Sequence, residues 1–145
     1  GSDEKLERAR ALGADHLINY RTHPGFSEAV LSITGGRGVD LVMEHVGGEI
    51  FSESLKCVRV DGTIVTVGGH GGEVVPFDII PFFRRQLKLV GSKNASIAEL
   101  REVMGLVEQG RLSPVIDSVF PLADAAKAHA RIESRGFFGK VVLAC

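Results

Sequence analysis

The chain has 145 residues, of which 44% are hydrophobic and 24% are charged, and its formal net charge is -1. These values describe one ordinary globular domain without a basic or acidic field, so nucleic acid and an anionic membrane surface are poor partners. No apolar run approaches the roughly 20 residues that a membrane span requires. The two cysteines, Cys57 and Cys145, are too few for a disulfide framework, which predicts a reducing, cytoplasmic compartment.

Helices and strands alternate along the first half of the chain. Ser2 or Asp3 can cap a first helix, and Gly13 is suited to end it. The run VDLVME is nearly continuously apolar, which is typical of a parallel strand covered on both faces. The hydrophobic spacing predicts, in order, a helix from Asp3 to Gly13, a strand over residues 16–20, a helix over 26–34, a strand over 39–44, a helix over 49–58 and a strand over 63–69.

The same alternation continues through the second half. Asp78 can cap a short helix, and Ser96 and Glu99 form a capping box at the start of the clearest helix. After the short helix, the pattern predicts a strand over 87–92, a helix over 96–110, a strand over 115–120, a helix over 125–134 and a strand over 140–144. Strands that alternate with helices predict an α/β fold with a mostly parallel sheet and right-handed crossovers.

Five segments in this order resemble one family: EKLERARALGADHLINYR, GVDLVMEHVGG, DGTIVTVGGHGG, LKLVGS and GFFGKVVL. The likeness is to the medium-chain dehydrogenase/reductase superfamily, in its zinc-type alcohol dehydrogenase and quinone oxidoreductase branches. It implies a partial Rossmann fold, a doubly wound parallel sheet with helices on both faces. It further implies that residues 1–110 form part of an NAD(P)-binding Rossmann domain and that residues 111–145 form a tail that returns to the catalytic domain.

The dinucleotide fingerprint of Rossmann domains, G-x-G-x-x-G between a strand and a long helix, is not found in this sequence. The glycine clusters GGRG, GGE and GGHGG lack the G-x-G-x-x-G spacing, and none of them lies between a strand and a long helix. We therefore expect the first two strands of the sheet to be missing, which separates residues 16–20 from residues 39–44. Three parallel strands, centred on Val42, Val65 and Leu89, should then be adjacent in that order.

Ligands of open α/β sheets bind beyond the carboxyl ends of the strands. The resemblance implies that two groups of residues at these ends, residues 68–70 and residues 91–92, hold the nicotinamide through backbone atoms. The alternative is that their glycines only form turns. The two residues after the first buried strand would border the cofactor ribose and nicotinamide, although an ion pair or a surface turn explains the histidine equally well. These candidates are Gly68, Gly69 and His70, Gly91 and Ser92, and His45 and Val46.

A second group of candidates would surround the adenosine ribose if the missing strand ended just before Ser2. It consists of Ser2, Lys5, Tyr20 and Arg21, whose donors suit a 2′-phosphate better than a hydroxyl and so favour NADP(H) over NAD. The alternative is that Lys5 and Arg21 are ordinary solvent-exposed charges that bind no phosphate. By the resemblance, Lys140 matches a basic position that reaches the cofactor pyrophosphate in the family. The alternative is that this lysine only keeps an edge strand soluble, as lysines on edge strands commonly do.

No pair of histidines or cysteines has close metal-ligand spacing, and no catalytic residue is assigned. The resemblance implies that any zinc of the parent protein is held by the absent catalytic domain. The predicted function is the cofactor-binding portion of an NAD(P)-dependent oxidoreductase that transfers hydride to or from an alcohol, carbonyl or quinone, with the isolated chain inactive. It would form a homodimer through the strand at Leu89. The alternative is a non-catalytic module that binds nucleotide weakly or dimerises.

Overall fold

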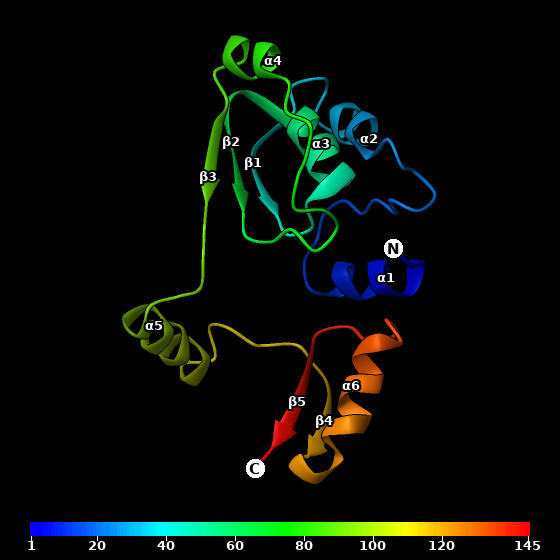
Figure 1. The fold of residues 1–145 in the computed structure, drawn as a ribbon, viewed down its shortest axis with the longest axis vertical. Coiled ribbons are helices and arrows are strands. Elements are labelled where there is room, and N and C mark those ends of the chain that lie inside the picture. The colour runs from blue at the N-terminus through cyan, green and yellow to red at the C-terminus, as the bar shows by residue number, and fades with distance from the viewer. The chain divides into compact units, whose positions relative to one another are not determined.

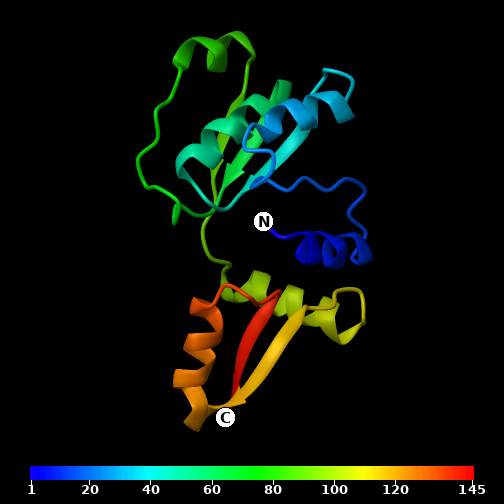
Figure 2. The ribbon, with the colours of Figure 1, turned by 90° about the vertical axis from the view of Figure 1, so that its right-hand side faces the viewer.

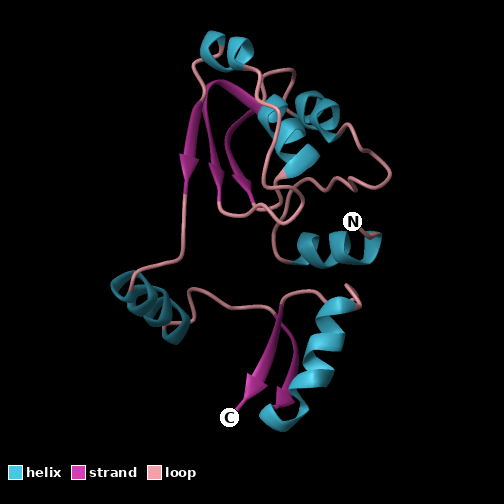
Figure 3. Ribbon diagram, in the orientation of Figure 1, coloured by secondary structure: helices cyan, strands magenta, loops and turns pink.

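The computed structural model describes residues 1–145, which form two compact units, 1–93 and 94–145. Figure 1 labels the elements, and Figure 3 separates helices, strands and loops. The first unit contains α1 (Asp3–Ala11), α2 (Phe26–Ile33), β1 (Val39–Glu44), α3 (Gly48–Cys57), β2 (Val58–Thr66), α4 (Ile79–Arg84) and β3 (Lys88–Gly91). The second contains α5 (Ile97–Glu108), β4 (Ile116–Pro121), a 3-10 turn (Leu122–Asp124), α6 (Ala125–Glu133) and β5 (Lys140–Ala144).

Three parallel strands form the sheet of the first unit, in the order β1-β2-β3. Val42 pairs with Ile64, and Ile64 pairs with Leu89. This confirms the predicted order and direction of the three central strands. Because parallel neighbours require a crossover, α3 connects β1 to β2 and α4 lies in the connection from β2 to β3. All three carboxyl ends therefore meet at one edge of the sheet.

The core of this unit lies between the sheet and α3. Its buried cluster consists of Phe51, Val58, Ile64 and Leu87, against which Val42, Leu55, Val75 and Phe82 pack. Helix α3 contacts β1 and β2, and α2 packs on α3. Side chains alternate along a strand, so Leu41 and Met43 point to the opposite face, where they are 53% and 54% exposed. Within residues 1–93, α3 with α2 packed on it thus covers the face of Val42 and Ile64, and the predicted helices on the opposite face of this sheet are not found.

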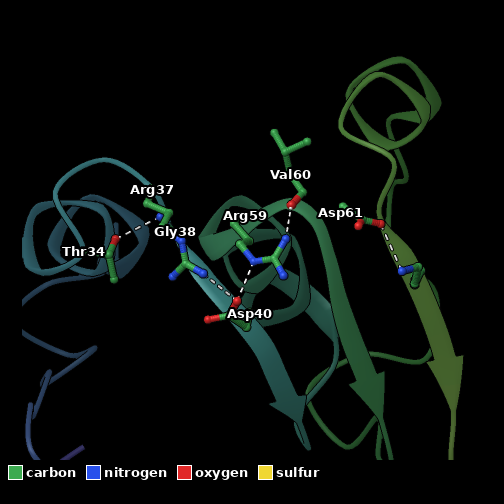
Figure 4. A network of polar contacts seen from close by, with 8 residues as sticks. Thr34, Arg37, Gly38, Asp40, Arg59, Val60 and Asp61 are labelled. Atoms are coloured by element: carbon green, nitrogen blue, oxygen red, sulfur yellow. Dashed lines mark hydrogen bonds and ion pairs between the residues drawn. The ribbon is translucent and has the colours of Figure 1, made fainter.

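A polar network joins the strands near their amino ends (Figure 4). The Asp40 carboxylate accepts hydrogen bonds from Arg59 at 2.5 Å and from Arg37 at 2.6 Å, and these two guanidinium groups lower the pKa of Asp40. Lys88 on β3 pairs with Asp61 of β2 at 3.0 Å. These ion pairs lie at the end of the sheet opposite the carboxyl ends of its strands.

The predicted strand over residues 16–20 is wrong. Residues 16–19 form no regular structure and Tyr20 belongs to a turn. The sheet ends at β1, so these residues have no neighbouring strand to supply a ladder of hydrogen bonds. The apolar pattern of residues 16–20 depends on this segment alone, whereas a β-strand also needs a neighbouring strand to pair with.

The second unit is a β-α-β arrangement preceded by a helix (Figure 2). Strands β4 and β5 are parallel, with α6 between them in the chain. Helix α5 begins at the capping box of Ser96 and Glu99, which confirms that prediction. The units divide after Lys93, while the expected boundary between cofactor domain and tail, after residue 110, stays a prediction. None of the helices has the length and apolar character needed to cross a bilayer.

Candidate functional site

The turn that follows β1 is organised by a buried carboxylate. Glu44 is 2% exposed, and its Oε1 accepts hydrogen bonds from the backbone N–H groups of Val46 at 2.7 Å and Gly47 at 3.0 Å. His45, which lies between Glu44 and Val46 in the chain, is exposed to solvent. The candidate residues His45 and Val46 therefore lie at the carboxyl end of β1, as predicted, on a backbone that a charged group holds in place.

The turn after β2 packs directly on the turn after β1. A Cβ atom added to Gly68 would lie 2.5 Å from the carbonyl oxygen of His45, so this glycine is required for a close approach of two backbones. The Gly71 N–H donates to the Val46 carbonyl at 2.6 Å. Gly69 is different, since the nearest atom to its added Cβ would be 3.7 Å away. Gly68 is thus required by the close packing of the two turns, whereas Gly69 has room for a Cβ atom.

An apolar hollow of about 310 Å³ opens beside these turns. It is lined by Ile18, Tyr20, Phe26, Val46 and Ile50. Three of these five residues were not predicted as site residues, because their apolar side chains matched the pattern of a strand or of a helix face. Only the packing of segment 16–20 against α2 and α3 reveals them as a common surface.

The segment before α2 is tied back to the start of α1. The Asn19 side-chain amide donates to the Asp3 carboxylate at 2.9 Å, and the Asn19 side-chain oxygen accepts from the Arg21 backbone N–H at 3.1 Å. These contacts carry the turn at Tyr20 and Arg21 to the amino end of α1.

The predicted group of Ser2, Lys5, Tyr20 and Arg21 is brought together there. Ser2 caps α1 by accepting from the Lys5 backbone N–H at 3.4 Å. A Cβ added to Gly1 would lie 2.7 Å from the Tyr20 hydroxyl and 2.9 Å from the Arg21 guanidinium. Burial, and then the positive charges of Arg21 and Lys5, lower the pKa of the Gly1 amine. Because Tyr20 also lines the hollow, a cationic region adjoins an apolar one.

The remaining candidates are placed as follows. Ser92 follows β3, and its N–H donates to the Thr66 carbonyl at 2.9 Å, while an added Cβ on Gly91 would meet no atom within 4 Å. His70 is exposed in the turn after β2. Lys140 begins β5 in the second unit, where its N–H donates to the Val115 carbonyl at 2.8 Å.

The chain offers neither a metal centre nor an activated nucleophile. No three histidine, cysteine, aspartate or glutamate side chains lie close enough together to hold a metal ion. Burial is the main cause that raises the pKa of the Cys57 thiol to about 11, which disfavours the reactive thiolate. The residues present therefore do not fit a zinc site.

Comparisons with known proteins identify the family of this chain. A family model described as zinc-binding dehydrogenase matches residues 12–143. The chain is 32% identical to a zinc-type alcohol dehydrogenase-like protein of Schizosaccharomyces pombe, over 98% of the chain and 42% of that protein. It is 33% identical to quinone oxidoreductase-like protein 2 of Bos taurus, over 99% and 43%. A crystal structure of an NAD-dependent alcohol dehydrogenase aligns with a TM-score of 0.86 and 42% identity, over 100% of the chain and 42% of that protein. The chain thus spans about two fifths of the length of these relatives.

Proposed function

Because the chain belongs to the zinc-binding dehydrogenase family, we propose that it is the cofactor-binding portion of an NAD(P)-dependent oxidoreductase. The enzyme would transfer hydride between NAD(P)H and an alcohol, carbonyl or quinone. The nicotinamide supplies the hydride chemistry when the cofactor is bound, and the residues of this chain bind and orient it. The observation that carries the proposal is the apolar hollow beside a cationic region, since adenosine phosphates combine a flat ring with negative charge.

The adenosine end of the cofactor would occupy the first unit. The adenine ring would enter the hollow of Tyr20, Phe26 and Val46. The 2′-phosphate of NADP(H) would lie near Lys5 and Arg21, whose charges favour an anion. One solved relative is NAD-dependent, and the proposed preference for NADP(H) rests on the donor groups of Ser2, Lys5, Tyr20 and Arg21.

The nicotinamide end would lie along the carboxyl ends of β2 and β3. Gly91 has open space where a side chain would be, so a flat ring could lie against its backbone, and Gly68, Gly69, His70 and Ser92 would border that ring. Lys140 would meet the pyrophosphate. A glycine-rich G-x-G-x-x-G turn, which holds the pyrophosphate in Rossmann domains, is not among these 145 residues. We therefore propose that the isolated chain binds cofactor weakly and is inactive.

The proposal predicts how fragments of the cofactor bind to the 145-residue chain. We expect 2′,5′-ADP to bind roughly tenfold more tightly than 5′-AMP, because hydrogen bonds to a charged phosphate are the stronger ones. NADPH should bind about as weakly as 2′,5′-ADP, in roughly the millimolar range, because its pyrophosphate and nicotinamide gain few contacts that offset the cost of immobilisation. Chemical-shift titrations of the labelled chain measure all three affinities.

Arg21→Gln should remove much of the preference for 2′,5′-ADP and leave the affinity for 5′-AMP unchanged. Arg84→Gln, a matched loss of charge on α4, should alter neither affinity. Equal binding of the two nucleotides by the native chain would refute the NADP(H) preference. Micromolar binding of NADPH would favour the alternative, a self-sufficient nucleotide-binding module, and no binding of any nucleotide would refute the proposed function.

We also propose a homodimer through β3. All four residues of this strand are exposed, and it is an edge of the sheet with unpaired backbone groups. Sedimentation should show a dimer that forms with increasing concentration, and hydrogen exchange of β3 amides should slow as it forms. Sedimentation as a monomer at millimolar concentration, or slower exchange at β1 instead, would contradict this arrangement.

A cytoplasmic location completes the proposal. Both Cys57 and Cys145 are free thiols, which is the ordinary state of cysteine in a reducing compartment. The parent enzyme would act on a small-molecule substrate.

A further inference from the structure

Glu44 is a buried charged group that the proposed site leaves without a role. We infer that Glu44 is a positioning residue for adenine recognition: its carboxylate holds the turn after β1 so that Val46 lines the apolar hollow. The inference rests on the proposed function, because it assigns the hollow to the adenine ring. Glu44 itself would not touch the ligand.

The contacts of the carboxylate account for the shape of the turn. Oε1 accepts from Val46 and Gly47, and Oε2 accepts from Gly47 at 3.1 Å. Gly47 has a φ of +78°, a left-handed conformation that glycine adopts without strain. The negative charge also lies at the amino end of α3, where the helix dipole stabilises it. The sharp turn therefore depends on one charged group and one glycine.

Val46 is held from both sides. Its N–H donates to Glu44 at 2.7 Å, and its carbonyl accepts from the Gly71 N–H at 2.6 Å. Its side chain is 42% exposed and lines the hollow together with Ile50. Loss of the Glu44 contact would free the backbone of Val46 on one side, so the wall of the hollow would lose its defined position.

The same carboxylate takes up a backbone donor that a phosphate could otherwise use. The amino end of a helix with glycines before it commonly binds phosphate through backbone N–H groups. In this turn the Gly47 N–H is already bonded to Glu44, and the Gly48 N–H is bonded to the Gly72 carbonyl at 3.1 Å. These two N–H groups are thus not available to a phosphate, whereas the apolar side chain of Val46 lines the hollow.

The test compares Glu44→Gln with Glu49→Gln, which removes an exposed charge from the first turn of the same helix. Glu44→Gln should shift the amide resonances of Val46 and Gly47 and weaken 5′-AMP and 2′,5′-ADP equally, by roughly threefold to tenfold, the factor of one net hydrogen bond. Because both ligands share the adenine ring, the ratio of their affinities should stay native. Glu49→Gln should change neither the resonances nor the affinities.

A double-mutant cycle separates positioning from a general loss of structure. Val46→Ala removes the wall of the hollow without touching the carboxylate, and adding Glu44→Gln to it should cause no further loss of 5′-AMP affinity. Fully additive losses would overturn the inference, as would native 5′-AMP affinity in a Glu44→Gln variant with altered amide resonances. If Glu44→Gln does not fold, Glu44→Asp, which keeps the charge and shortens the reach, serves in its place with the same expected results. Failure of the native chain to bind either nucleotide would instead refute the proposed function.

Discussion

Replacement of Gly68 by alanine is expected to destabilise the first unit by about 1–3 kcal/mol, the usual cost of forcing an extra group into a packed site. The new methyl group would lie 2.5 Å from the carbonyl oxygen of His45, which is backbone and has no alternative rotamer. One of the two turns must therefore move. Urea denaturation, followed by circular dichroism and by amide resonances of β1 and β2, measures the loss.

Gly69→Ala is the matched control, since its added methyl group would lie 3.7 Å from the nearest atom, an ordinary van der Waals distance. It should leave the free energy of unfolding within a few tenths of a kcal/mol of the native value, because no atom has to move to admit the methyl group. If Gly69 borders the nicotinamide, cofactor affinity should fall in Gly69→Ala while stability stays native. Equal stability of the Gly68 and Gly69 variants would contradict the close approach of the two turns.

Replacement of Asp117 by asparagine is expected to destabilise the second unit strongly at neutral pH. The Asp117 side chain is 4% exposed and accepts two hydrogen bonds of 2.9 Å from Arg131 and one of 3.0 Å from the Phe138 N–H. It therefore ties β4 to α6 and to the turn before β5. Asparagine has one acceptor oxygen and no charge, so it leaves the guanidinium incompletely paired. Hydrogen exchange of the Val141 and Val142 amides reports the loss locally.

The same carboxylate predicts a dependence on pH. Arg131 first, then the Phe138 N–H and the Ser118 hydroxyl, hold the pKa of Asp117 well below its usual range. A group whose pKa is lower in the folded state contributes stability above its unfolded pKa of about 3.9, and this contribution is lost as the pH falls toward the folded value. The native unit should thus lose stability below about pH 4, and its advantage over Asp117→Asn should shrink there.

Asp124→Asn provides the control for this pair of measurements. Asp124 is in the same unit, and its ion pair with Lys127 is exposed, so its loss should have little effect at any pH. A difference between native protein and Asp117→Asn that stays constant from pH 7 to about pH 2 would contradict the role of the charge.

Much of the local structure was predictable because it depends on residues three or four positions apart. The caps at Ser2, Asp78 and Ser96 each accept a backbone hydrogen bond at the start of the predicted helix. The order of β1, β2 and β3 was also predicted, from their continuous apolar character together with the family resemblance. The family itself is confirmed by the match over residues 12–143.

The candidate site was predictable only in part. The structure places Ser2, Lys5, Tyr20 and Arg21 near one another and His45 and Val46 at the carboxyl end of β1, while their role in binding a cofactor stays a prediction. The hollow was missed, because Ile18, Phe26 and Ile50 belong to three separate segments and their spacing in the chain gives no sign of contact. The ion pair of Asp117 and Arg131 was not predicted either, because the two residues are 14 positions apart in the chain.

The amino-acid order alone thus specified where most helices begin, which segments are apolar enough for a buried strand, and the family, because each depends on neighbours within one turn or on ordered motifs. Tertiary contacts decided the rest. Segment 16–19 has a strand-like pattern and remains irregular, since no strand lies beside it to complete its hydrogen bonds. Gly68 is indispensable where Gly69 is not, because only Gly68 faces the carbonyl of His45, 23 positions earlier in the chain.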